Sequence, residues 1–390
     1  MRPYNGAFSA MAMRLLFALV VLLVQPLAFA QQAAVAAPAL PAIAAKAYVL
    51  LDFNSGQILA SDHPDERVEP ASLTKLMTAY LAFMALKQKT LNPDQIVPVS
   101  QRAWRAQGSR MFVEPHKPVT VNELIRGMIV QSGNDACIAL AEAIAGSEEV
   151  FARMMTREAQ RLGMKNTHFV NATGLPHPQH YSTAQDMAVL AAAIVRDFPE
   201  YYPLYATKEF RYNNISQSNR NRLLWTDPTV DGMKTGYTED AGYCLVTSAR
   251  RDNRRLISVL MGAASDSARA IESQKLLNYG FQFYDTVRLY EKNQPVATLQ
   301  VWKGSSNAVK AGFASDFYLT LPKGQADKLS ANVESMQPLL APISAGQRVG
   351  TMRLMLDGKL YRELPVVALE SVPVAGMLGR GWDSIRLLFK

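Results

Sequence analysis

Three β-rich runs between Asp231 and Ala263 constrain the fold of this chain more than any other feature. Near the other end of the chain, "AYVLLDFNSGQILASD" places two further strand-like runs around the turn Asn54-Ser55-Gly56, which predicts a β-hairpin. The three later runs are separated by turn residues, namely Gly236, Gly242 and Arg251-Asp252-Asn253. The pattern predicts an α/β protein whose antiparallel sheet is built from both ends of this region, with a helical segment inserted.

Helical patterns occupy the intervening segment and the stretch after it. "EPASLTKLMTAY" reads as the start of an amphipathic helix, and "TVNELIRGMIV" begins with Thr120 and Glu123 in the spacing of a capping box. Thr183 and Asp186 repeat that capping spacing. Further helices are expected to start around Asp135 and to cover residues 148–162, 183–196 and 265–284.

From about Val287 to Leu369 the pattern changes to short β-rich runs such as "VATLQVW", "FYLTLP", "RVGTMRLML" and "ELPVVAL". Lys323-Gly324 and Asp357-Gly358 supply turn signals between runs. We expect a small all-β domain here.

The last residues predict an amphipathic helix. At 100° per residue one face is apolar and the other polar; the apolar face is formed by Met377, Leu378, Trp382, Ile385, Leu388 and Phe389, and the polar face by Arg380, Asp383, Arg386 and Lys390. Such a helix can lie in a membrane interface, and the alternative is a helix packed on its own protein.

The N-terminus carries the marks of an export signal. Arg2 and Arg14 precede an apolar run, and Ala28-Phe29-Ala30 offers a small-residue cleavage site, although a retained anchor is an alternative. We therefore expect a signal peptide over 1–30, a linker over 31–45, an α/β domain over 46–286, a β domain over 287–372 and the terminal helix over 373–390. Such a signal predicts an exported protein.

Charge and cysteine content narrow the class of partner. The formal charge falls from +8 to +6 when Arg2 and Arg14 are removed, and no long basic block occurs. This favours an anionic wall or membrane surface and argues against nucleic acid. Cys137 and Cys244 are the only cysteines, so the chain is not a disulfide scaffold, and we expect two buried thiols.

Ser72 and Lys75 form the first candidate site. A serine becomes a nucleophile when a base within hydrogen-bond reach takes its proton, and residues i and i+3 share one face of a helix. A lysine serves as that base only when burial or another cation lowers its pKa. Taken alone, the pair has a simpler interpretation, a polar residue near a helix start and a solvated charge.

Two later motifs change this balance. Ser132-Gly133-Asn134 lies in the break between two helices, where plain N-capping is the alternative, and Lys234-Thr235-Gly236 lies in a strand-like run, where a kink at Gly236 is the alternative. Ser-x-x-Lys, Ser-x-Asn and Lys-Thr-Gly in this order are the signature of penicillin-binding proteins and class A β-lactamases. A second Ser-x-Asn, Ser305 to Asn307, is out of order.

The wider sequence resembles one family within this group. "RVEPASLTKLMTAY", "GMIVQSGNDACIALAE", "GMKNTHFVNATGLPHPQHYSTAQDMAVLA", "NRNRLLW" and "VDGMKTGYTEDAGYCLVTSARRDNRRLISVLMG" are similar to stretches of type-5 low-molecular-mass penicillin-binding proteins, which are D-alanyl-D-alanine carboxypeptidases of the S11 serine peptidases. The likeness covers nearly all of the chain beyond the signal. It implies that residues 46–286 form a penicillin-binding, β-lactamase-like catalytic domain, followed by a β-rich domain and an amphipathic tail. It also implies a location at the periplasmic face of the bacterial inner membrane.

The resemblance implies an acyl-enzyme mechanism. Ser72 would attack the carbonyl between two D-alanines, Lys75 would be the general base, and Ser132 would relay a proton to the leaving amine. The implied substrate-binding residues are Asn134, Lys234, Thr235, Gly236, Arg220 and Tyr237, with the backbone N–H groups of Ser72 and Tyr237 as the oxyanion hole.

The implied partners are stem peptides of peptidoglycan that end in D-Ala-D-Ala, with β-lactams as covalent inhibitors. No cofactor or metal is implied, and His168, His177 and His180 are interpreted as structural. Tyr237 departs from the family pattern, in which many members carry another residue such as His, so only its backbone role is carried over.

Three rival functions remain open at this level. A class A β-lactamase would need a deacylating glutamate, usually within Glu-x-x-Leu-Asn, and that string is absent. A D,D-endopeptidase that cuts cross-links would share all three motifs. A non-catalytic wall-binding scaffold would have no need for Ser72, Lys75, Ser132 and Lys234 together.

Overall fold

The computed structural model describes residues 39–387, and the predicted signal peptide lies outside them. An antiparallel five-stranded sheet organises the first two thirds of this range, with strand order β2-β1-β7-β6-β5. Its strands are β1 (Ala47–Asp52), β2 (Ile58–Asp62), β5 (Val230–Thr238), β6 (Gly242–Arg251) and β7 (Arg254–Ala263). The prediction of a sheet assembled from both ends of this region is confirmed.

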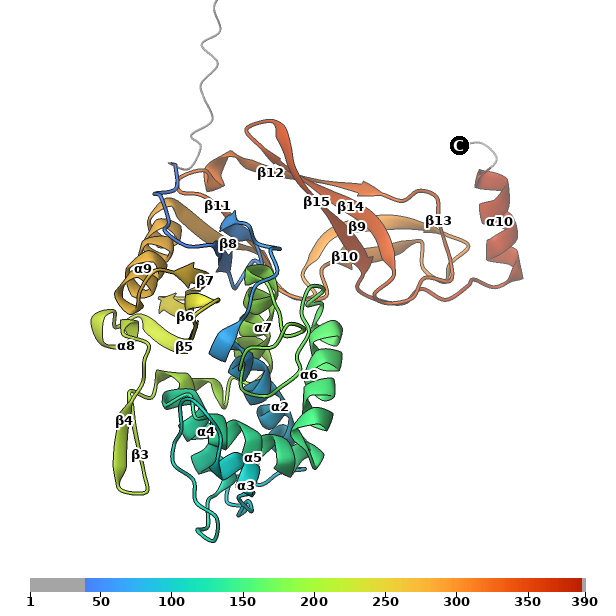
Figure 1. Cartoon of the computed structure of the whole chain (residues 1–390). Helices are drawn as coiled ribbons and strands as arrows, with labels where there is room; N and C mark the ends of the chain where they lie inside the picture. Colours follow the sequence, from blue (N-terminus) through green and yellow to red (C-terminus); the bar gives the residue numbers. More distant parts are fainter. Residues whose placement is uncertain (1–38, 388–390) are drawn as a thin grey trace, which may run out of the picture. The chain divides into compact units, whose positions relative to one another are not determined.

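Alternation along the strands places different side chains on the two faces of this sheet. In β1, Val49 and Leu51 belong to the core shared with the inserted helices, whereas Tyr48 and Leu50 belong to the core under α9 (Asp266–Phe283). Figure 1 shows α9 on one side of the sheet and the inserted helix α7 (Ala184–Asp197) on the other. The strands β1, β6 and β7 are therefore mostly buried on both faces, whereas the edge strand β2 is largely exposed.

The inserted segment is mainly helical. Thr120 and Glu123 form the predicted capping box, and Ser147, Thr183 and Ser265 each cap a helix through the side-chain oxygen. Its elements are η1 (Ala71–Thr74), α2 (Lys75–Lys87), α3 (Gln101–Trp104), α4 (Val121–Val130), α5 (Asn134–Ala145), α6 (Glu148–Leu162), α7 (Ala184–Asp197), η2 (Tyr202–Ala206), the hairpin β3 (Glu209–Tyr212) and β4 (Ile215–Ser218), and α8 (Leu223–Thr226).

The helix that follows Ser72 differs from the prediction. Ser72 lies in the 3-10 turn η1 and Lys75 begins α2, so the two residues occupy consecutive elements. The predicted amphipathic character is wrong: α2 is buried on almost every side, because it packs against α4, α5, α6 and α7. In a 3-10 turn, residues i and i+3 eclipse, so the turn aligns Ser72 with Lys75.

A β-rich C-terminal domain has its own apolar core, which includes Val309, Val349 and Leu354. Its main sheet has the order β12-β14-β15-β10-β9-β13, and β8 pairs with β11. The elements are β8 (Tyr284–Tyr290), β9 (Pro295–Trp302), β10 (Ala308–Gly312), β11 (Phe317–Pro322), η3 (Ala326–Lys328), β12 (Leu329–Ser335), β13 (Leu339–Leu340), β14 (Arg348–Leu356) and β15 (Lys359–Ala368). The prediction of a small all-β domain is confirmed, while its numbered boundaries stay predictions.

The described chain ends in helix α10 (Met377–Leu387). Asp383 is buried and accepts a hydrogen bond from the backbone N–H of Lys303 at 2.6 Å, and the Arg386 guanidinium lies 5.8 Å from the Trp302 ring centre. Part of the polar face thus packs on the β domain. Within residues 39–387, no helix has the length and apolar character that would let it cross a bilayer.

Candidate active site

Ser72 and Lys75 are hydrogen-bonded at the start of α2. Lys75 Nζ lies 2.8 Å from Ser72 Oγ and donates a second hydrogen bond to the carbonyl oxygen of Thr173 at 2.6 Å. The Lys75 side chain is 1% exposed. The lysine is therefore held against the serine hydroxyl in an environment that excludes water.

Burial lowers the pKa of Lys75 to about 8. The neighbouring Cys137 and Asp135 raise this pKa, and the charge of Arg220 lowers it. At pH 7 roughly one Lys75 in ten is then neutral. The neutral amine has a lone pair that can accept the Ser72 proton.

The loop that holds Lys75 depends on a glycine. Gly174 has φ +82°, and a Cβ there would lie 1.8 Å from the carbonyl oxygen of Ala71. Only glycine permits this approach to the turn that carries Ser72. Asn171 Oδ1 tightens the loop by accepting from the N–H groups of Thr173 and Gly174.

His180 contacts the turn that carries Ser72 through Thr74. Its Nδ1 accepts from the N–H of Val170 at 3.2 Å, and its Nε2 lies 2.7 Å from Thr74 Oγ1. Burial lowers the pKa of His180 to about 3, so the ring is neutral and carries its proton on Nε2, which donates to Thr74. This agrees with a structural role.

Ser132 and Asn134 each present a polar atom without a partner. Ser132 has φ +67°, and its buried Oγ has no hydrogen bond among the described residues. Gly133, not Ser132, caps α5, so the N-capping alternative does not explain this serine. Asn134 Nδ2 donates to the Gln107 carbonyl at 2.6 Å, whereas its Oδ1 is buried without a donor in the described structure. That oxygen is an acceptor available to a ligand.

Asp135 fixes the loop beside these residues. Its carboxylate accepts four backbone N–H bonds of 2.8–3.1 Å, from Met111, Phe112, Val113 and Ala136. Phe112 has φ +69°, a conformation that costs energy for this residue type. From the sequence alone Asp135 is expected only near a helix start, because an acidic residue in a first helical turn is common.

Lys234, Thr235 and Gly236 lie in β5, the edge strand of the catalytic sheet. A Cβ on Gly236 would lie 3.1 Å from the carbonyl oxygen of Pro70 and 3.3 Å from the Leu73 nitrogen. The glycine therefore lets the strand approach the turn that carries Ser72. Close packing therefore explains Gly236 better than the alternative of a simple kink in the strand.

Several positively charged side chains lie close together where β5 meets the turn that carries Ser72. Lys234 is 3% exposed, and its Nζ donates to the carbonyl oxygen of Thr235 at 3.0 Å. Burial lowers the pKa of Lys234 well below its usual value, and the charges of Lys75, Arg220 and Arg269 lower it further. Burial also lowers the pKa of Arg220. A bound carboxylate would relieve this repulsion.

Two other predictions concern side chains at and near the site. Tyr237 is 51% exposed, and its ring centre lies 4.4 Å from that of Tyr243. Cys137 and Cys244 are buried free thiols, as expected. Burial raises the pKa of Cys137 to about 12, so this thiol beside Lys75 stays protonated.

Comparisons with known proteins agree with the motifs. A family model described as D-alanyl-D-alanine carboxypeptidase matches residues 31–265, and one described as penicillin-binding protein 5, C-terminal domain, matches 284–374. The chain belongs to the D-alanyl-D-alanine carboxypeptidase family. Its fold, motifs and relatives make it a serine-type carboxypeptidase.

The relatives are similar over most of their length. D-alanyl-D-alanine carboxypeptidase DacC of Escherichia coli is 43% identical, over 93% of this chain and 92% of the relative. DacA of the same organism is 42% identical, over 90% and 89%. The crystal structure of penicillin-binding protein 5 from Haemophilus influenzae superposes with a TM-score of 0.83 at 43% identity, covering 85% of this chain and 98% of that one. Each of these matches extends over most of the present chain.

Proposed function

We propose that the chain removes the terminal D-alanine from peptidoglycan stem peptides through an acyl-enzyme on Ser72. The observation that carries the proposal is the 2.8 Å contact between Ser72 Oγ and the buried Nζ of Lys75, whose pKa is lowered to about 8. In such a pair the lysine can activate the serine near neutral pH without the help of another side chain.

In the first step Ser72 Oγ bonds to the carbonyl carbon between the two D-alanines as its proton passes to Lys75 Nζ. The oxyanion would accept from the backbone N–H groups of Ser72 and Tyr237. The position of β5 at the sheet edge supports this assignment, because N–H groups on its outer side face no further strand. The C–N bond then breaks as the leaving amine takes a proton relayed through Ser132 Oγ, and D-alanine departs.

Hydrolysis of the ester completes the cycle. Water adds to the acyl carbon, and Ser72 Oγ leaves with a proton. The same first step on a β-lactam opens the ring, but the departing nitrogen stays attached to the acyl group. We expect β-lactams to act as covalent inhibitors for this reason.

Substrate recognition follows from the polarity of the site. The positive groups Lys234 and Arg220, with the hydroxyl of Thr235, suit the terminal carboxylate of a stem peptide. Asn134 Oδ1 would accept a hydrogen bond from an N–H group of the peptide, because Asn134 Nδ2 already donates to the Gln107 carbonyl oxygen. The role of Gly236 is to let β5 pack closely against the turn that carries Ser72, because the glycine has no side chain.

We also propose that α10 holds the protein at the periplasmic face of the inner membrane. Asp383 and Arg386 of its polar face contact the β domain, while Met377 and Trp382 are 83% and 64% exposed. Exposed Met and Trp opposite a packed polar face suit a membrane interface. Removal of residues 374–390 is expected to release the protein from membranes with carboxypeptidase activity retained, and a truncated protein that still sediments with membranes would contradict this.

D-alanine release from a stem pentapeptide tests the main proposal. We expect release by the wild type, its loss after treatment with penicillin, and a loss of roughly 10⁴-fold or more in Ser72→Ala. Ser305→Ala, in a Ser-x-Asn that is out of order, is the matched control and should keep full activity. Activity confined to cross-linked dimers would indicate an endopeptidase, and rapid turnover of labelled penicillin a β-lactamase.

A further inference from the structure

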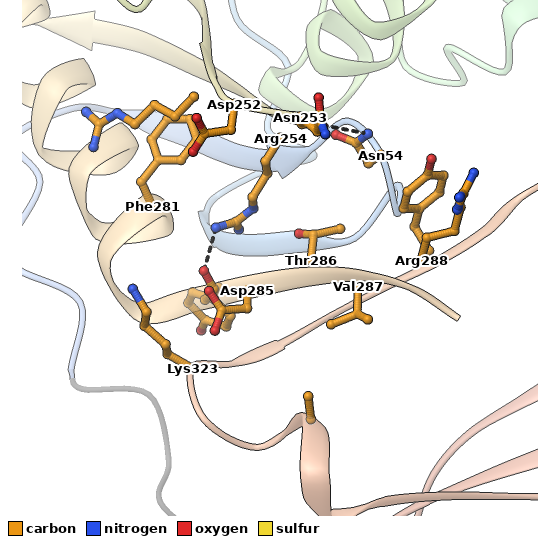
Figure 2. A pocket seen from close by; sticks show the side chains of 14 residues that line it. Asn54, Asp252, Asn253, Arg254, Phe281, Asp285, Thr286, Val287, Arg288 and Lys323 are labelled. Atoms are coloured by element: carbon orange, nitrogen blue, oxygen red, sulfur yellow. Dashed lines mark hydrogen bonds between the residues drawn. The ribbon is translucent and has the colours of Figure 1, made fainter. Parts of the chain in front are cut away.

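A cavity lies at the far end of the catalytic sheet, where it meets the β domain. It has a volume of about 1000 Å³ and is bordered by the β6–β7 turn, the end of α9, and strands β8 and β11 (Figure 2). This is at the upper end of the range of small-molecule sites. We call it the junction cavity.

The arginines around the junction cavity are paired with carboxylates of the protein. The nearest nitrogens of Arg254, Arg251 and Arg288 lie 2.8, 3.7 and 2.8 Å from carboxylate oxygens of Asp52, Asp227 and Glu291. The cavity is therefore not a strongly positive site, and a polyanion has no particular reason to bind there.

Other polar side chains in the cavity have no such partners. The side chains of Asp252, Asp285 and Lys323 form no hydrogen bond or ion pair with any part of the chain between residues 39 and 387. Figure 2 shows Asp285 and Lys323 on the β8 and β11 side of the cavity and Asp252 on the side of the turn. The walls thus offer both acceptors and a donor, which is the combination that hydroxyl and amide groups require.

Aromatic rings complete the lining. Phe281, Tyr284 and Tyr318 all border the cavity and are half-buried. Phe281 is held by two guanidinium groups, since Arg251 and Arg254 lie 4.3 Å and 5.6 Å from its ring centre. Apolar ring surface next to mixed donors and acceptors matches a pyranose, whose C–H faces are apolar and whose rim carries hydroxyl and acetamido groups.

The cavity lies one strand length from the reaction centre. Gly236 pairs with Cys244 on β6, and β6 continues to Arg251 at the cavity. Seven residues of strand span about 23 Å. A ligand in the cavity therefore leaves the Ser72 site open.

We propose that the junction cavity binds a saccharide of the peptidoglycan glycan strand, so that the enzyme holds the polymer while it trims a stem peptide. This inference rests on the proposed function, because it assigns a second contact with the same substrate. It predicts that cavity variants lose activity on the polymer and keep activity on a free peptide.

The test uses the full mature chain, the Tyr318→Ala variant and the double variant D285A/K323A, which preserves net charge. The probe is chitotetraose, a peptide-free β-1,4-linked tetramer of N-acetylglucosamine, followed by titration calorimetry. We expect binding by the wild type and about tenfold weaker binding by both variants, as lost hydrogen bonds and ring contact imply. The control D65A/K165A changes two exposed residues outside the cavity and should bind like the wild type.

Activity provides the second readout. D-alanine release from a soluble pentapeptide should be unchanged in D285A/K323A, whereas release from intact sacculi should fall several-fold. Absence of chitotetraose binding by the wild type, equal binding by all variants, or unchanged processing of sacculi would overturn the proposal. Failure of every protein to act on the soluble peptide would instead overturn the proposed function, because the calorimetric result does not depend on catalysis.

Discussion

The catalytic region and the β domain differ in where their polar side chains lie. In the catalytic region Lys75, Lys234 and Asp135 are buried, and all the buried side-chain atoms without partners that the described structure contains lie between residues 132 and 273. In the β domain the core is apolar, and ion pairs such as those of Arg353 with Glu334 and Glu363 are exposed.

This difference indicates that the catalytic region is built for ligand binding and reaction, and the β domain for stability. Buried polar groups without partners cost free energy, so a fold retains them where a ligand completes them. Exposed ion pairs contribute little to stability. We therefore expect substitutions at Lys75, Ser132 and Lys234 to reduce activity more than stability, and substitutions in the β-domain core to do the reverse.

The largest effect is expected from Lys75→Met, which keeps an unbranched side chain of similar size and removes the base. Acylation by a labelled penicillin should slow by roughly 10³–10⁴-fold, the upper range for loss of a general base. Lys87→Met, at the exposed end of the same helix, is the control and should acylate normally. Comparable rates in the two variants would mean that another group takes the Ser72 proton.

Ser132→Ala should have the next largest effect. Ser132 Oγ has no partner to lose in the described structure, so the free energy of unfolding should change by less than about 1 kcal/mol. Loss of the proton relay should slow D-alanine release by roughly 10²–10³-fold. A large loss of stability with normal turnover would identify Ser132 as a structural residue and weaken the contrast between the two regions.

The β domain should respond in the opposite sense. Leu354→Ala removes a fully buried side chain and should destabilise this domain by about 2–5 kcal/mol, while activity on a soluble pentapeptide stays within twofold of the wild type. Hydrogen exchange of β14 and β15 measures the local change. Leu360→Ala, 54% exposed on the neighbouring strand, should change exchange little. Lost peptide activity in Leu354→Ala would show that the domains are energetically coupled.

Local signals in the sequence were sufficient for much of the fold. The Thr120–Glu123 capping box, the first hairpin and the strand runs of both sheets depend on neighbours in the chain, and the structure contains them. The burial of α2 was missed, because it depends on helices that come later in the chain.

The site was only partly predictable for the same reason. The contact of Lys75 with Thr173 joins residues 98 positions apart, and Asp135 acts on a loop more than 20 residues earlier in the chain. No local pattern encodes such contacts. The roles of Arg220 and Tyr237 came from the family resemblance alone, and they stay predictions until substitutions test them.

The pH dependence of Ser72 acylation by a β-lactam tests the central claim most directly, which is that Lys75 is the base. With a pKa of about 8, Lys75 gains its lone pair as pH rises, so the acylation rate should increase and level off above an inflection near pH 8. Asp135→Asn removes a charge that raises this pKa and should move the inflection to lower pH. A rate that keeps rising to pH 10, or an inflection that Asp135→Asn leaves in place, would contradict the account.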